Sequence, residues 1–69
     1  MKVLVFGATG GAGRAIVSRL LDEGHDVTAF VRDPRAMEAA ERLTIVEGDA
    51  TDAEDVARTL PGHDAIVIG

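Results

Sequence analysis

Four short apolar runs lie along the chain, and the segments between them are polar or have helical periodicity. The first run, Val3–Phe6, is apolar at every position, which is typical of a strand covered on both faces of a parallel sheet. The second and third runs also include polar residues, and the fourth is apolar throughout. The pattern predicts four strands: Val3–Phe6, Asp26 to about Val31, Leu43–Glu47 and Ala65–Ile68.

The segment between the first two strands has the pattern of an amphipathic helix. From Gly11 to about Glu23, apolar residues recur at helical spacing, and polar residues occupy much of the opposite side. Gly24 follows at a position where helices often end in a left-handed residue. The apolar positions of this first predicted helix are Ile16, Val17, Leu20 and Leu21.

Two further helices are predicted from their starting signals. Asp33 and Pro34 suit an N-cap and a first helical position, so we expect a second helix that extends to about Arg42. Thr51 and Glu54 fit a capping box, in which each side chain satisfies a free backbone N–H at a helix start. The third helix then has an apolar stripe made of Ala53, Val56, Ala57 and Leu60.

Strands that alternate with helices predict a single α/β domain over residues 1–69, with a parallel sheet and right-handed crossovers. We expect strand order 3-2-1-4 and three helices. This arrangement is a truncated Rossmann fold, the first half of a doubly wound sheet plus one strand beyond its switch point. The last strand is then an apolar edge without lysine or proline, which predicts a homodimer or higher oligomer that covers it.

Composition excludes several classes of function. The 69 residues carry a formal net charge of −5, which opposes electrostatic binding of nucleic acid. Phe6 and Phe30 are the only aromatic residues, so no base-stacking platform exists. The absence of cysteine excludes disulfides and thiolate metal sites. The apolar runs are too short to span a bilayer, and we expect a cytoplasmic protein with no membrane partner.

Three glycines recur at every third position directly after the first strand. In a strand-to-helix turn that binds a dinucleotide, the first glycine permits the turn, the second lets the pyrophosphate approach, and the third lets helix and strand pack closely. Gly7, Gly10 and Gly13 fit these roles, although the spacing is G-x-x-G-x-x-G rather than G-x-G-x-x-G. The alternative is a tight turn with no ligand. Further donors near the phosphates are expected from Thr9, Gly11 and Ala12.

The end of the second strand predicts which dinucleotide is preferred. An acidic residue there accepts a hydrogen bond from the adenosine ribose 2′-hydroxyl, whereas an arginine accommodates a 2′-phosphate. Arg32 occupies this position and Arg35 adds a second positive charge one turn later, which favours NADP(H) over NAD(H). Asp33 is the competing candidate, but its place before Pro34 already explains it as a cap. The alternative for Arg32 is a solvated loop residue.

Polar residues also follow the third strand, in the segment "EGDATD". Asp49 is expected at the carboxyl edge of the sheet, where adenine should lie. An aspartate that bonds its own turn is an equally good interpretation. His25 and His63 each stand in a "GHD" turn before a strand and are expected to face solvent rather than to act as catalysts or metal ligands.

The segments "VLVFGATGGAGRAIVSRLLDEGHDVTAFVRDP" and "EGDATDAEDVARTLPGHDAIVIG" together resemble the N-terminal part of an atypical short-chain dehydrogenase/reductase. The resemblance points to the NAD(P)H-binding group that includes NmrA-like redox sensors and flavin reductase/biliverdin-IXβ reductase. It implies that Arg32 and Arg35 hold the 2′-phosphate, that Asp49 and Ala50 flank adenine, and that Gly69 lies near the nicotinamide-side ribose. Around the pyrophosphate it implies Gly7, Thr9, Gly10, Gly11, Ala12 and Gly13.

The resemblance also implies an NAD(P)H-dependent oxidoreductase, but the catalytic part is not found in this sequence. Members of the family are roughly three times as long if they form a complete domain. The sequence has no tyrosine and its only lysine is Lys2, so it lacks the Tyr-x-x-x-Lys relay that some members use. Three hypotheses remain: the dinucleotide-binding portion of a reductase, a non-catalytic redox sensor, or a structural module that self-associates.

Overall fold

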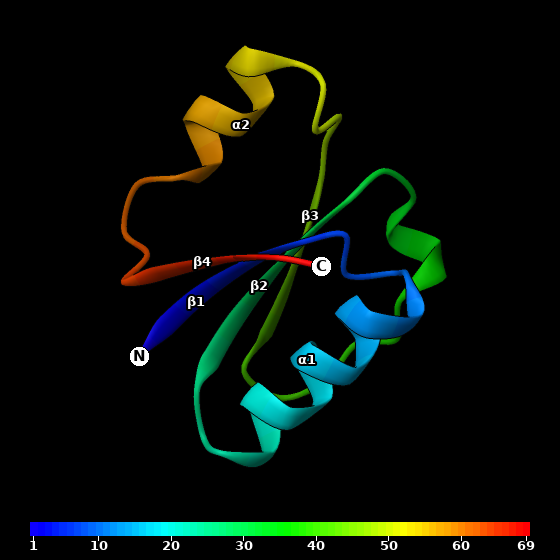
Figure 1. Ribbon diagram of the computed structural model, residues 1–69, viewed down its shortest axis with the longest axis vertical. Coiled ribbons are helices and arrows are strands. Elements are labelled where there is room, and N and C mark those ends of the chain that lie inside the picture. Colours follow the sequence, from blue (N-terminus) through cyan, green and yellow to red (C-terminus); the bar gives the residue numbers. More distant parts are fainter.

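The computed structural model describes residues 1–69 and has the predicted α/β architecture (Figure 1). The four strands are parallel and lie in the order β3-β2-β1-β4, which confirms the predicted topology. Neither helix has the length and apolar composition that crossing a bilayer requires. In chain order the elements are β1 (Lys2–Phe6), α1 (Gly11–Asp22), β2 (Asp26–Val31), the 3₁₀ turn η1 (Pro34–Ala36), β3 (Leu43–Glu47), α2 (Ala53–Thr59) and β4 (Ala65–Ile68).

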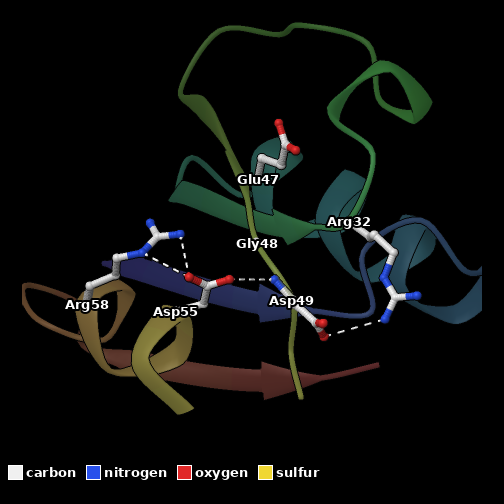
Figure 2. Close-up of a pocket in the computed structure, with 6 residues that line it drawn as sticks. All are labelled: Arg32, Glu47, Gly48, Asp49, Asp55 and Arg58. Carbon is white, nitrogen blue, oxygen red and sulfur yellow. Dashed lines mark hydrogen bonds and ion pairs between the residues drawn. The ribbon is translucent and has the colours of Figure 1, made fainter. Parts of the chain in front are cut away.

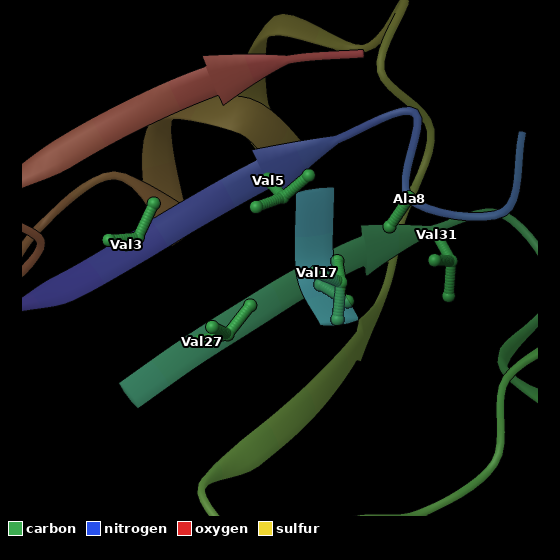
Figure 3. Close-up of a cluster of buried hydrophobic side chains, with 7 residues drawn as sticks. Val3, Val5, Ala8, Val17, Val27 and Val31 are labelled. Carbon is green, nitrogen blue, oxygen red and sulfur yellow. The ribbon is translucent and has the colours of Figure 1, made fainter. Parts of the chain in front are cut away.

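The main core lies between the sheet and α1. The central strand β1 pairs with β2 and β4, so that Val5 lies opposite Ala29 on one side and Val67 on the other. Successive strand residues point to opposite faces, and the odd-numbered valines of β1 therefore share one face. Figure 3 shows Val17 of α1 packed near these strands. The buried cluster comprises Val3, Val5, Ala8, Val17, Val27, Ala29 and Val31.

The opposite face of the sheet is only partly covered. Leu4 is fully buried, and the rings of Phe6 and Phe30 lie 5.1 Å apart between centroids. On β4, however, Ile66 is 50% exposed and Ile68 is 81% exposed. The apolar residues on this face thus become progressively more accessible toward the β4 edge.

The prediction of a second helix, from Asp33 and Pro34 to about Arg42, is wrong. Asp33 is an N-cap as expected, because its Oδ1 accepts a hydrogen bond from the Arg35 backbone N–H at 3.0 Å. The turn that follows covers only Pro34–Ala36, and Met37 is already extended, with φ −124° and ψ 139°. Residues 38–42 are all exposed. A helix over them would bury no apolar face, and short helices depend on such packing for stability.

The capping box at the third predicted helix is also wrong. The N-cap of α2 is Asp52, whose Oδ1 accepts from the backbone N–H of Glu54 at 2.9 Å and of Asp55 at 3.4 Å. Thr51 lies one residue too early, and its hydroxyl instead donates to Asp49 Oδ1 at 2.7 Å. Asp52 therefore satisfies the N–H groups that Thr51 was expected to bind.

His63 does not face solvent as expected. It is half-buried, with Nε2 at 2.8 Å from the Thr28 hydroxyl and Nδ1 at 3.3 Å from the carbonyl oxygen of Leu60. Because the Leu60 carbonyl can only accept, Nδ1 carries the proton in this arrangement. The side chain thus links the turn before β4 to the middle of β2.

Candidate functional site

The turn after β1 has the conformation that its first glycine was predicted to allow. Gly7 adopts φ +70°, which side chains disfavour, and a Cβ there would lie 2.8 Å from the carbonyl oxygen of Gly69. The turn is closed by a hydrogen bond of 3.3 Å from the Gly10 N–H to the Gly7 carbonyl oxygen. Gly69, which follows β4, therefore lies directly against the glycine-rich loop.

The third glycine has the predicted packing role. A Cβ on Gly13 would overlap the carbonyl oxygen of Gly7, and the Cα of Ala8 would lie 2.9 Å from it. Any side chain at this position would push α1 away from the end of β1. Gly13 thus determines how closely the start of the helix approaches the strand.

The middle of the loop is open. A Cβ on Gly10 would meet nothing closer than the Gly7 carbonyl oxygen at 3.6 Å, and a Cβ on Gly11 would have no neighbour within 4 Å. Gly10 is the N-cap of α1 and offers no side-chain cap, and the first turn of the helix holds no acidic residue. The free N–H groups and positive dipole end of α1 are therefore available to an external anion.

A hollow of about 200 Å³ adjoins this loop at the carboxyl ends of the strands. Gly7, Thr9, Arg32 and Ala50 were expected in the site, and all four line this hollow. The aromatic ring of Phe30 contributes to its wall, and a Cβ on Gly48 would overlap that ring. The remaining lining residues are Ala8, Val31 and Gly48, which sequence reasoning did not single out.

Arg32 and Asp49 meet beside the hollow. Arg32 Nη2 lies 3.4 Å from Asp49 Oδ1, and the arginine side chain is 80% exposed. The same Asp49 oxygen accepts from the Thr51 N–H at 2.9 Å and from the Thr51 hydroxyl at 2.7 Å. The hydrogen bond from the Thr51 hydroxyl has the largest effect in lowering the pKa of Asp49, and the one from the Thr51 N–H lowers it further. Asp49 is therefore a turn aspartate, as one of the two interpretations proposed, and it also lies next to Arg32.

Arg32 and Asp49 also line a larger polar hollow of about 650 Å³, together with Asp55 and Arg58 of α2 (Figure 2). There the Asp49 N–H donates to Asp55 Oδ2 at 3.0 Å, and Arg58 Nη2 donates to Asp55 Oδ1 at 2.9 Å. The Asp49 N–H, followed by Arg58, lowers the pKa of Asp55. Helix α2 thereby holds the loop after β3. The sequence around Asp55 and Arg58 indicates only a helix. It therefore gives no sign that Asp55 contacts the loop after β3.

Arg35 is not brought to the small hollow. Its Nε lies 3.1 Å from Asp33 Oδ1, and its Nη2 donates to Asp33 Oδ2 at 3.4 Å. The hydrogen bonds from the Arg35 side chain, and after them the one from the Arg35 backbone N–H, lower the pKa of Asp33. The predicted second cation is thus already paired, and of the two arginines Arg32 alone adjoins the glycine-rich loop.

Arg14 connects the glycine-rich loop to the turn after β2. Its Nε donates to the Thr9 carbonyl oxygen at 2.9 Å, and its Nη2 donates to the Ala36 carbonyl oxygen at 2.8 Å. The side chain thus reaches Ala36, which lies 22 positions from Arg14 in the sequence. Arg14 lies within the first predicted helix, Gly11 to about Glu23, and sequence reasoning missed this role.

Comparisons with known proteins agree with this geometry. A family model described as NAD(P)H-binding matches residues 7–69. A 3-beta-hydroxysteroid dehydrogenase from Mycolicibacterium neoaurum is 45% identical over 65 residues, which cover 94% of this chain and 18% of that protein. Photosystem II assembly factor Ycf39 from a Synechocystis species is 38% identical over 69 residues, covering 97% of this chain and 21% of the relative.

A solved structure shares the same fold. The oxidoreductase ylbE from Lactococcus lactis superposes with a TM-score of 0.89 at 26% identity, over 99% of this chain and 32% of that one. The chain thus spans about a fifth of the length of the two curated relatives and about a third of the solved protein. With a glycine-rich strand-to-helix turn, a parallel sheet ordered 3-2-1-4 and a family match over residues 7–69, this chain belongs to the NAD(P)H-binding family.

Proposed function

We propose that this chain is the dinucleotide-binding portion of an NAD(P)H-dependent oxidoreductase of the atypical short-chain type, with a preference for NADP(H). The observation that carries the proposal is the uncapped start of α1, which opens beside a hollow that Arg32 borders. These two features lie at the carboxyl edge of a parallel sheet, where ligands of such folds bind.

The pyrophosphate is assigned to the start of α1. Gly10 and Gly11 present backbone without side chains, so a phosphate oxygen can approach the N–H groups of the first turn. The absence of a side-chain cap or a first-turn carboxylate leaves the positive end of the helix dipole uncompensated. Thr9, Ala12 and Gly13 complete the predicted set of donors.

The adenosine is assigned to the hollow of about 200 Å³, with Ala50 and Asp49 beside the base. Its ribose then lies near the end of β2. Asp33 is poorly placed to accept from the 2′-hydroxyl, because both of its oxygens already accept hydrogen bonds from Arg35. Arg32 is free except for its single contact with Asp49, which supports recognition of a 2′-phosphate.

When bound, a nicotinamide dinucleotide supplies the hydride for reduction or accepts it for oxidation. The residues of this chain bind and orient the cofactor, and Gly69 lies where the ribose on the nicotinamide side is expected. A second candidate is binding without catalysis. It is supported by the similarity to Ycf39, which is named as an assembly factor and not as a dehydrogenase.

Calorimetric titration of the chain with NADPH and with NADH tests the proposal. We expect both dinucleotides to bind, NADPH more tightly. In Arg32→Ala the affinity for NADPH should fall about tenfold or more, because one charge-assisted contact to phosphate is lost, while NADH binding changes little. Arg19→Ala is the matched control, since Arg19 lies exposed in the last turn of α1.

Two outcomes would contradict the proposal. No detectable heat or competition with either dinucleotide would remove the binding function. An equal loss of NADPH and NADH affinity in Arg32→Ala would remove the 2′-phosphate preference alone. Oxidation of NADPH with flavin or quinone acceptors by a chain that includes the remainder of the relatives' length separates the enzymatic candidate from the binding-only one.

A further inference from the structure

We propose that Asp49 sets the selectivity between NADPH and NADH, because it competes with the 2′-phosphate for Arg32. The inference rests on the proposed function, since it assigns a role within the same dinucleotide site. Asp49 thereby becomes a specificity-determining residue that opposes NADPH, in addition to any contact that it makes with adenine.

The first step of the argument is that the Asp49 carboxylate is fixed in place. Its Oδ1 accepts two hydrogen bonds from Thr51, at 2.9 Å from the backbone N–H and 2.7 Å from the hydroxyl. Its own N–H is held by Asp55 Oδ2 at 3.0 Å. When Arg32 leaves, these contacts remain, so the negative charge stays beside the arginine's position.

The second step concerns what holds Asp55. Arg58 donates to Asp55 Oδ1 through Nη2 at 2.9 Å and through Nε at 3.3 Å (Figure 2). The pair lies on α2, one turn apart, and anchors the loop after β3 from the side opposite to Arg32. Asp49 is therefore held by Thr51 of its own loop and by Asp55 of α2, while Arg32 is held by Asp49 alone.

The third step is electrostatic. The contact between Arg32 and Asp49 is 3.4 Å long, uses one nitrogen, and has side chains that are 80% and 47% exposed, so a dianionic phosphate can displace it. A phosphate bound to Arg32 then lies close to the fixed Asp49 carboxylate, and the two like charges repel. The 2′-hydroxyl of NADH carries no charge and can donate to Asp49 Oδ2, which accepts no hydrogen bond within the chain. The same carboxylate thus opposes one dinucleotide and tolerates the other.

Asp49→Asn tests the inference, because it removes the charge and keeps the shape. In calorimetric titrations at about 50 mM salt, we expect NADPH to bind two- to fivefold more tightly than to the wild type, the range that one exposed ion pair produces. NADH should bind equally well or more weakly. The NADPH-to-NADH affinity ratio should therefore rise, and the rise should shrink at about 0.5 M salt, where the Debye length is only a few ångströms.

Two further variants make the result specific. Asp26→Asn removes one charge at the amino end of β2, about 20 Å from Arg32 along a strand of six residues, and should leave the ratio unchanged. When Arg32→Ala is already present, Asp49→Asn has no arginine to release. Its gain in NADPH affinity should therefore be smaller than in the wild type, and the effects of the two changes should be non-additive.

The outcomes separate this inference from the proposed function. A wild type that binds neither dinucleotide overturns both. A wild type that binds, with an Asp49→Asn variant whose affinity ratio is unchanged or lowered, overturns the inference and leaves the proposed function standing. An equal gain in the presence and absence of Arg32 also overturns it, because competition for the arginine would then not be the cause.

Discussion

Gly10→Asp separates helix stability from ligand binding at the start of α1. Gly10 has φ −73° and ψ 165°, an extended conformation that any residue adopts, and a Cβ there would lie 3.6 Å from its nearest neighbour. The new carboxylate can therefore accept from the N–H groups of the first turn without displacing the backbone. It would occupy the place that we assign to the pyrophosphate.

The expected gain in stability follows from the missing cap. Replacing glycine by aspartate at an N-cap contributes a few tenths of a kcal/mol, and the charge adds about 0.3–1 kcal/mol through the helix dipole. The total of about 0.5–1.5 kcal/mol raises Tm by roughly 2–12 °C in a domain of this size. The affinity for NADPH should fall at least about tenfold, because a charge-assisted contact is lost and a repulsion is introduced.

Circular-dichroism melts and calorimetric titration with NADPH measure the two effects on the same samples. Gly10→Asn is the matched variant, since it caps the helix without charge and should stabilise less while still weakening NADPH. If Gly10→Asp stabilises the chain but binds NADPH like the wild type, the pyrophosphate does not lie at the start of α1. A fall in Tm would instead contradict the extended conformation of Gly10 and the open space beside it, on which the expected cap depends.

Two other predictions concern acid and self-association. The pKa values of Asp33, Asp49 and Asp55 are lowered from the ordinary 3.8 by hydrogen bonds in the folded chain, so these groups stabilise the fold above about pH 4, and this stability is lost as the pH falls through the lower folded values. Thermal melts from pH 2 to 7 should therefore show a decline below pH 4 that is smaller in Asp55→Asn; an identical decline in both proteins would contradict the cause. Because Ile66 and Ile68 are exposed on the β4 edge, we expect a homodimer or higher oligomer in light scattering at micromolar concentration, and Ile68→Lys should shift it toward monomer. A monomeric wild type would refute that expectation.

The strands were predictable because their signals are local and strong, and their order because parallel βαβ units follow few topologies. The apolar runs of β3 and β4 have the observed limits, alternation with helical segments predicts a parallel sheet, and the doubly wound topology predicts the order. The role of Gly13 was also predictable, since a helix can follow a strand so closely only where no side chain intervenes. The strand limits and the glycine-rich turn depend on residues near one another in the chain, whereas the strand order joins the first strand to the last.

The errors arise where a local signal competes with a contact from elsewhere. The Asp33–Pro34 start was correct, but the segment after Ala36 has no face to bury, and its helix does not form. Thr51 has the spacing of a capping box, yet Asp49 accepts the hydrogen bond of its hydroxyl and Asp52 caps α2.

The site contacts of Arg14 and Asp55 were missed for a related reason. Arg14 reaches Ala36 across 22 positions, and Asp55 receives the Asp49 N–H from a different element. Each lies on a helix with an ordinary polar pattern. No periodicity or spacing indicates such contacts, because they depend on how separate elements pack.

The most direct test of the dinucleotide cradle is an NMR titration of amide N–H groups with NADPH, with adenosine as the ligand that lacks a pyrophosphate. We expect the largest NADPH-specific shifts at Gly10, Gly11, Ala12 and Gly13. The N–H groups of Gly11, Ala12 and Gly13 are free at the start of α1, and that of Gly10 closes the turn onto Gly7 beside them. Adenosine should leave these four amides nearly unchanged. Saturable NADPH binding that shifts other amides but not these four would contradict the assignment of the pyrophosphate to this turn.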